Sequence, residues 1–148
     1  MLQLAKKTYY AVEAVLYIAY NTTSDPVSSR EIADKQDLPP RYLEQIMQKL
    51  VRAGILRGVR GPRGGYLLAR ERRRIHVREI CEVVQELETE ELLAHSTALG
   101  HKVIFPLCDE LVAQLFERLE NVTLADLCDQ AKSANIRRTA DEPTDFMI

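Results

Sequence analysis

The stretch that most constrains the fold is LRGVRGPRGGYLLA, residues 56–69, where four glycines and one proline stand among three arginines. A short apolar run lies on each side, and both runs are typical of strands. Glycine allows tight turns and close backbone approach, and proline stiffens a loop. The stretch therefore predicts a rigid two-stranded hairpin with arginines at its tip.

The residues before this hairpin predict three helices separated by short turns. Residues 7–20 place apolar side chains at helical spacing, and NTTSDP ends that helix. Ser28 followed by Glu31 is a capping-box pattern, which predicts the start of a short second helix. Pro40 suits the first position of a third helix, and Gly54 suits its C-terminal cap.

Three helices followed by a hairpin are the layout of a winged helix-turn-helix domain, which we expect over residues 1–75. We expect a mainly α protein, because residues 76–130 predict further helices with a loop between them. The polar composition of residues 131–148 predicts a disordered tail.

Within the second part of the chain, the helical signals differ in strength. IHVREICEVVQE has one apolar helical face, whereas residues 86–103 predict either a loop or a loose helical segment. Pro106 begins a strong helix through Leu119, in which leucines recur every four residues. Thr123 with Asp126 predicts one or two further helical turns.

The charges divide the chain into a basic and an acidic half. Residues 1–74 hold 14 Lys and Arg against 7 Asp and Glu, whereas residues 75–148 hold 6 against 15. A basic half suggests contact with a polyanion, although a chance division of solvated charges would give the same pattern.

The third helix has an apolar side and an opposite polar face that suits the major groove of double-stranded DNA. Arginine can pair with guanine, glutamine with adenine, and glutamate with cytosine. Base contacts come mostly from the N-terminal end of a recognition helix, so residues near the other end are expected at phosphates. The expected groove residues are Arg41, Tyr42, Glu44 and Gln45, and the expected phosphate contacts are Lys49 and Arg52.

Two other elements complete the expected DNA surface. Ser28 and Ser29, at the start of the second helix, would present backbone N–H groups to a phosphate. Arg60 and Arg63 would project from the hairpin, which Pro62 stiffens, toward a minor groove or flanking phosphates. A solvated surface helix is the alternative interpretation of the third helix by itself, and the adjacent arginine hairpin favours DNA.

Together these segments resemble the Rrf-type family of bacterial transcription regulators, which includes IscR, NsrR and CymR. The resemblance lies in KKTYYAVEAVLYIA, in SSREIADKQDLPPRYLEQIMQKLVRAGILRGVRGPRGGYLLAR, and in IHVREICEVVQE. It implies that Tyr42, Glu44, Gln45, Arg60 and Pro62 occupy DNA-contacting positions. Arg63 stands where the family often has glycine, so its contact is inferred from this sequence alone.

The resemblance also implies a homodimeric repressor that binds a pseudo-palindromic operator and is held together by a long C-terminal dimerisation helix. The apolar stripe on the predicted helix from Pro106 is larger than one small winged domain needs. A twofold dimer would place two recognition helices about one DNA turn apart. The expected interface residues are Leu107, Leu111, Val112, Leu115, Phe116 and Leu119.

Family members that sense iron, nitric oxide or redox state bind an iron–sulfur cluster through three closely spaced cysteines. Cys81, Cys108 and Cys128 lack that spacing. We therefore expect no cofactor or metal, and a signal that is a protein partner, a small-molecule effector or thiol oxidation. The alternative is a metal-dependent or iron–sulfur regulator that uses His95, His101 and Cys108.

Other functions fit the sequence less well. No nucleophile–base pair or carboxylate dyad indicates an enzyme. No apolar run approaches the roughly 20 residues of a membrane span, and the N-terminal segment does not resemble a signal peptide. We therefore expect a cytoplasmic protein with no membrane partner. A winged-helix module that binds proteins instead of DNA is the second alternative.

Overall fold

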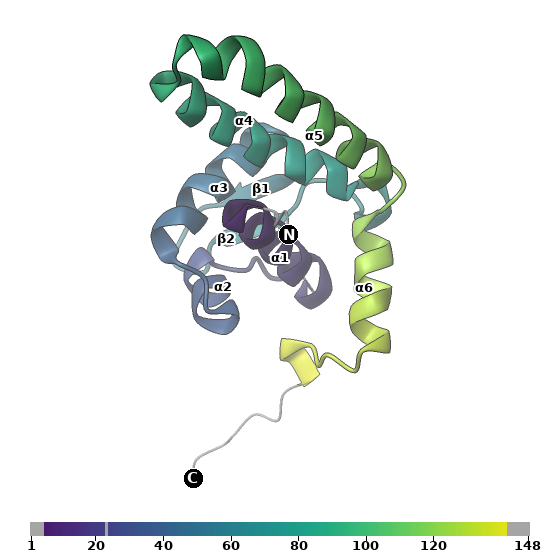
Figure 1. Cartoon of the computed structure of the whole chain (residues 1–148). Coiled ribbons are helices and arrows are strands. Elements are labelled where there is room, and N and C mark those ends of the chain that lie inside the picture. Colours follow the sequence, from purple (N-terminus) through teal and green to yellow (C-terminus); the bar gives the residue numbers. More distant parts are fainter. Residues whose placement is uncertain (1–4, 23, 142–148) are drawn as a thin grey trace.

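The structure is a computed structural model that describes residues 5–22 and 24–141. It is mainly helical, with one small antiparallel sheet, which confirms the expected fold class (Figure 1). The elements in chain order are α1 (Lys6–Asn21), α2 (Ser29–Gln36), α3 (Pro40–Arg52), β1 (Leu56–Val59), β2 (Gly65–Leu68), η1 (Arg72–Arg74), α4 (Val77–His95), η2 (Gly100–Ile104), α5 (Phe105–Leu119), α6 (Leu124–Ser133) and η3 (Thr139–Asp141).

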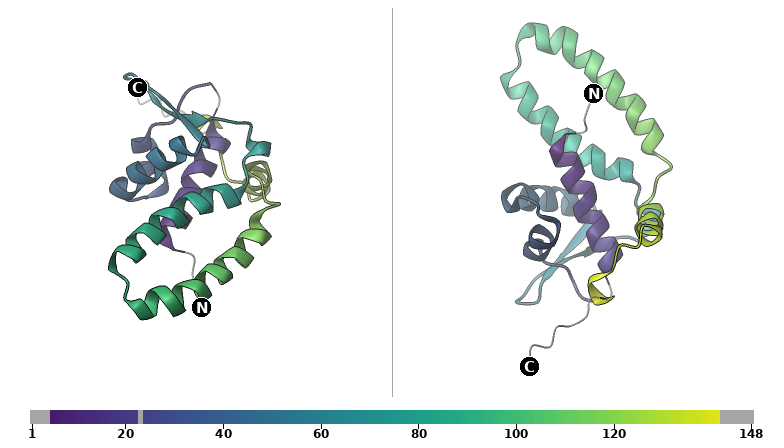
Figure 2. Two further views of the ribbon diagram at one scale, coloured as in Figure 1. Left: turned by 90° about the horizontal axis from the view of Figure 1, so that it is seen from above. Right: turned by 60° about the horizontal axis from the view of Figure 1, so that its bottom comes forward.

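Helix α1 lies at the centre of the core and packs against α3, α4, α6 and the sheet. Its apolar residues recur at helical spacing, and Ala11, Ala14 and Ile18 are fully buried. Helices α4 and α5 form a long antiparallel pair that projects from this core (Figure 2). Helix α6 returns to the core and packs against α1. None of the helices in the described ranges is both long and apolar enough to cross a bilayer.

The ends of the helix-turn-helix are fixed by local hydrogen bonds. The Ser28 side chain accepts from the Glu31 N–H and begins α2 as predicted. Gly54 follows α3 at a φ of 73°, and its N–H donates to the Val51 carbonyl while Ile55 donates to Leu50. This Schellman motif ends α3 and turns the chain directly into β1.

The two strands of the wing pair from Leu56 with Leu68 to Val59 with Gly65. A further bridge joins Tyr66 to Val27, which lies in the connection between α1 and α2. The N–H of Val27 donates to the Tyr66 carbonyl at 3.0 Å, and the return bond measures 2.8 Å. The wing is therefore tied to the residue that precedes the N-cap of α2.

Of the two conformations predicted for residues 86–103, the structure has the helical one over most of the segment, because α4 continues to His95. Leu87 is buried, and Glu88 and Glu91 pair with Lys7 of α1. Lys7, from a distant part of the sequence, therefore offsets the repulsion between these acidic side chains, which favours the helical conformation. Beyond it, a π-helical turn leads directly into α5.

Part of the tail expected to be disordered is ordered. Helix α6 runs to Ser133, and the Tyr20 hydroxyl then donates to the Ile136 carbonyl at 2.5 Å. The Thr139 N–H donates to Asn21 Oδ1 at 2.7 Å. Polar groups on α1 hold a segment whose own sequence has no strong apolar period. Residues 142–148 lie outside the described residues.

Candidate nucleic-acid interface

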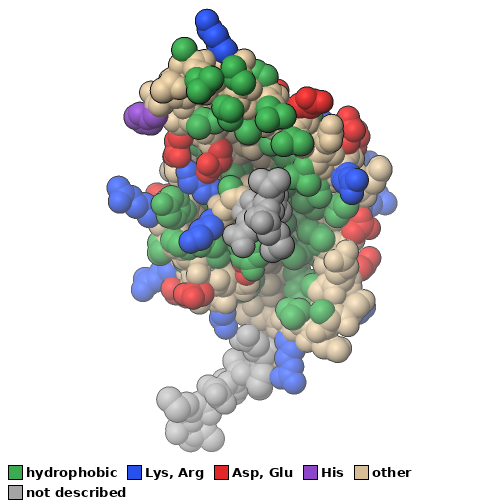
Figure 3. Space-filling model, in the orientation of Figure 1, with side chains coloured by type: hydrophobic (Ala, Val, Ile, Leu, Met, Phe, Trp, Pro, Cys, Tyr) green, Lys and Arg blue, Asp and Glu red, His purple; other side chains and the backbone are tan. Residues whose placement is uncertain are grey.

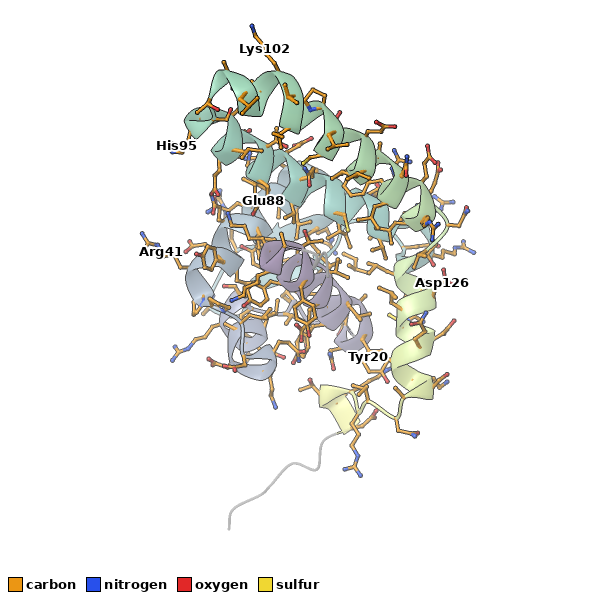
Figure 4. The ribbon with its side chains drawn as sticks, viewed as in Figure 1. Tyr20, Arg41, Glu88, His95, Lys102 and Asp126 are labelled. Atoms are coloured by element: carbon orange, nitrogen blue, oxygen red, sulfur yellow. The ribbon has the colours of Figure 1, made fainter. Side chains whose placement is uncertain are left out.

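Helix α3 presents a continuous polar face because its buried side chains all lie on one side. Leu43, Ile46, Met47 and Leu50 are buried against the core. The exposed residues recur at helical spacing on the opposite side, and Figure 4 shows Arg41 extending from this helix away from the protein. They are Arg41, Glu44, Gln45, Gln48 and Arg52.

Gln48 belongs to this face but was not among the predicted site residues. It lies three positions after Gln45 and four after Glu44, so it shares their side of the helix. The sequence places Gln48 on the polar face, but base contacts are expected from the N-terminal end and phosphate contacts from Lys49 and Arg52, so it had no predicted DNA role. Its spacing from Gln45 was the available signal.

Two other predicted site residues lie at the edge of α3 that faces α1 and α4. Tyr42 is 47% exposed, and its ring lies 5.8 Å from Lys7 Nζ. Lys49 is half-buried, with Nζ 3.9 Å from Glu90 Oε1 of α4. The amine of Lys49 is therefore already near a carboxylate before any phosphate arrives.

The start of α2 provides a different kind of group. The Ser28 oxygen accepts the Glu31 N–H, so this side chain is engaged in capping the helix. Ser29 follows as the first helical residue and is partly exposed. The backbone N–H groups of a first helical turn have no intrahelical acceptor, which suits an anion.

The wing tip is a compact loop that exposes its cationic side chains. Gly61 takes a φ of 116°, and the Gly64 N–H donates to the Gly61 carbonyl at 2.9 Å. A side chain on Gly64 or Gly65 would collide with backbone atoms, so these two glycines permit close approach and Gly61 provides the positive φ. Arg60, Pro62 and Arg63 are all exposed.

The other predicted surface lies on α5, where no residue is buried. Hydrophobic side chains gather on the face of the molecule formed by α5 and η2 (Figure 3). Leu107, Leu111 and Leu115 are 56%, 51% and 38% exposed. Val112, Phe116 and Leu119 are half-buried on the side nearer the rest of the protein. Exposed apolar surface of this extent on one helix indicates an interaction site.

The residues suggested for a metal site do not form one. His95 ends α4, His101 lies in η2, and Cys108 is exposed on α5. Within residues 5–22 and 24–141, no group of three histidine, cysteine or acidic side chains is placed to hold a metal ion. Cys81 and Cys128 are buried in the core. With two cysteines buried in the core and the third exposed on α5, the cysteines do not fit a three-cysteine iron–sulfur cluster.

The cysteines should differ sharply in reactivity. Burial raises the pKa of the Cys81 thiol to about 11, and burial also raises the pKa of Cys128. Because the thiolate is the reactive form, iodoacetamide at neutral pH should modify only Cys108 in the folded protein. Mass spectrometry of peptides would check this, with denatured protein as the control in which all three react. Equal labelling of Cys81 in the folded protein would contradict the buried position.

The chain is similar in sequence and in structure to known bacterial regulators. The Rrf2 family model, described as an iron-dependent transcriptional regulator, matches residues 4–130. The HTH-type transcriptional regulator IscR of Cereibacter sphaeroides is 44% identical over 87 residues, covering 57% of this chain and 56% of that protein. The protein slr0846 of Synechocystis sp. is 34% identical over 89% of this chain and 91% of its own length.

Solved structures give the same result. IscR of T. potens is 32% identical with a TM-score of 0.69, covering 94% of this chain and 95% of that one. The global cysteine regulator CymR of B. subtilis is 28% identical with a TM-score of 0.63, over 88% of this chain and 98% of that one. The chain therefore belongs to the Rrf2 family of helix-turn-helix transcriptional regulators, and its relatives are regulators, not enzymes.

Proposed function

We propose that this regulator is a cytoplasmic homodimer that represses transcription by binding a pseudo-palindromic operator. The observation that supports this most directly is that β1 of the arginine-bearing wing packs against α3, whose opposite face is polar and exposed. A helix of this kind can enter the major groove while the wing reaches the flanking groove or phosphates. In this proposal the predicted DNA-binding residues keep their roles, and Gln48 joins them.

The apolar face of α5 supports the dimeric part of the proposal. Leu107, Leu111 and Leu115 lie in a row on one side of the helix and face away from their own core. A groove of about 640 Å³ continues from Leu119 between α1 and α6, and apolar side chains dominate its lining. A second copy packed on α5 would bury this surface and set the spacing of two recognition helices.

The cysteine pattern supports a signal other than a three-cysteine cluster. Residues 82–107 contain no cysteine, although the resemblance places the three cluster ligands just before the dimerisation helix. We propose that a protein partner, a small ligand or oxidation of the exposed Cys108 regulates the protein instead.

Salt dependence tests the DNA-binding role. An operator can be selected from a random pool of duplexes by the wild-type protein, and its affinity measured over a range of salt concentrations. Phosphate contacts make the affinity fall steeply as salt rises. A protein that selects no sequence and binds no duplex at low salt would overturn the proposal and favour a protein-binding module.

Arg60→Ala should weaken binding to the selected operator by about ten- to a hundredfold, since a hydrogen bond that involves a charged group contributes roughly 1.5–3 kcal/mol. Fluorescence anisotropy with a labelled duplex would measure this. Lys102→Ala is the matched control, because Lys102 carries the same charge at the far end of the α4–α5 pair (Figure 4). Equal affinities for Arg60→Ala and the control would exclude insertion of the wing.

A further inference from the structure

One lysine connects the recognition helix to α4. Lys7 Nζ lies 2.9 Å from Glu91 Oε1 and 3.3 Å from Glu88 Oε1, both on α4. The same amine lies over the ring of Tyr42, 5.8 Å from its centroid. Figure 4 shows Glu88 on the side of α4 that faces α1. Three helices therefore meet at one cationic group.

The surroundings of Lys7 fix its amine in place. Its side chain is only 16% exposed, so it lacks the freedom of an ordinary surface lysine. Hydrogen bonds to Glu91 are the largest cause of the raised pKa of Lys7, and the bonds to Glu88 add to them while burial opposes both. A cation held over an aromatic face attracts the ring, which restrains the Tyr42 side chain.

Glu88 and Glu91 would be unfavourable for DNA binding if charge alone mattered. They lie near the edge of α3, and carboxylates repel phosphates. Here, however, both carboxylates pair with Lys7. They therefore orient the Lys7 amine, which lies over the ring of Tyr42 on α3. If the carboxylates mainly repel DNA, removing one should strengthen binding. If they mainly orient Lys7, removing one should weaken operator preference.

We propose that Lys7 is a positioning residue for DNA recognition, which holds the Tyr42 ring in its reading orientation by means of the Glu88 and Glu91 carboxylates. The inference rests on the proposed function, because it assumes that Tyr42 contacts the operator. Because Glu88 and Glu91 lie on α4, operator preference would then depend on the position of α4 and of the α5 helix that packs against it.

A double-mutant cycle separates positioning from direct phosphate contact. Lys7→Met should lower the preference for the selected operator over a scrambled duplex by about three- to tenfold. In a Tyr42→Leu background, the same change should have almost no further effect, since the ring is gone. If Lys7 instead touches a phosphate, the two losses will add and the salt slope will fall by about one contact.

Removal of one carboxylate provides the second test. Glu91→Gln should lower operator preference even though it removes a negative charge near DNA. Asp129→Asn is the matched control, because Asp129 is an exposed carboxylate on α6. Tighter binding by Glu91→Gln than by the control would show that repulsion dominates, and would overturn the inference.

A conservative variant distinguishes positioning from a simple loss of stability. Lys7→Arg should restore operator preference, since a guanidinium can pair with carboxylates and also stack on a ring. Circular dichroism would confirm that each variant is folded. If wild-type protein binds its operator and Lys7→Met retains full preference, the inference fails while the proposed function stands. If wild-type protein binds no duplex, both fail.

Discussion

Replacing Leu111 by glutamate should convert the protein to a folded monomer and lower its operator affinity by at least about a hundredfold. Leu111 lies between Leu107 and Leu115 in the exposed row on α5. In the proposed homodimer, a charge there would be buried against the second copy, which is costly without a partner. A monomer contacts one half-site, so much of the margin of about 10³–10⁷ between specific and non-specific binding is lost.

Sedimentation velocity would give the oligomeric state, and anisotropy with the selected operator would give the affinity. Ala113→Glu is the matched control, since Ala113 is an exposed residue of α5 on the side away from the leucine row. It introduces the same charge and should leave a dimer with unchanged affinity. A dimeric Leu111→Glu protein that binds normally would show that α5 is not the interface.

Gly65→Ala should destabilise the protein by about 3 kcal/mol and lower its thermal midpoint by roughly 6–12 °C. A Cβ atom at Gly65 would lie 2.4 Å from the Val27 carbonyl oxygen and 2.5 Å from its carbon. Both are backbone atoms, so neither can turn aside as a flexible side chain would. The wing must then separate from the connection between α1 and α2.

Differential scanning calorimetry would measure the midpoint. Gly58→Ala is the matched control, because a Cβ there meets no atom within 4 Å and the backbone does not have a positive φ. It should change the midpoint by no more than a degree or two. A Gly65→Ala protein as stable as this control would mean that the bridge between Val27 and Tyr66 is absent in solution.

Local patterns in the sequence predicted the elements whose causes are local. Ser28 with Glu31, Pro40 and Gly54 each act within a few residues, so the bounds of the helix-turn-helix follow from them. The apolar period of α3 likewise predicted which of its faces is exposed. The hairpin followed from its glycines, of which Gly61 has a positive φ while Gly64 and Gly65 allow close backbone approach.

Features that depend on distant residues could not be read from the sequence in this way. The sequence of the acidic end of α4 is compatible with a loop or a helix, and the pairing of Lys7 with Glu88 and Glu91 is a contact that only the structure reveals. The tail is polar, but Asn21 and Tyr20 of α1 provide its hydrogen-bond partners. Lys7 also lies outside the helix-turn-helix motif, so its contact with Tyr42 became apparent only when the helices were placed together.

The bridge between Val27 and Tyr66 bears on the thermodynamics of recognition. These hydrogen bonds fix the base of the wing to the start of α2 in the free protein, and the bond from Gly64 to Gly61 closes its tip, so little of the wing is left for a ligand to order. Less conformational entropy is then lost on association, so more of the contact energy is retained as affinity. In the proposed DNA complex, the same bonds would also keep the wing at a fixed position relative to the start of α2.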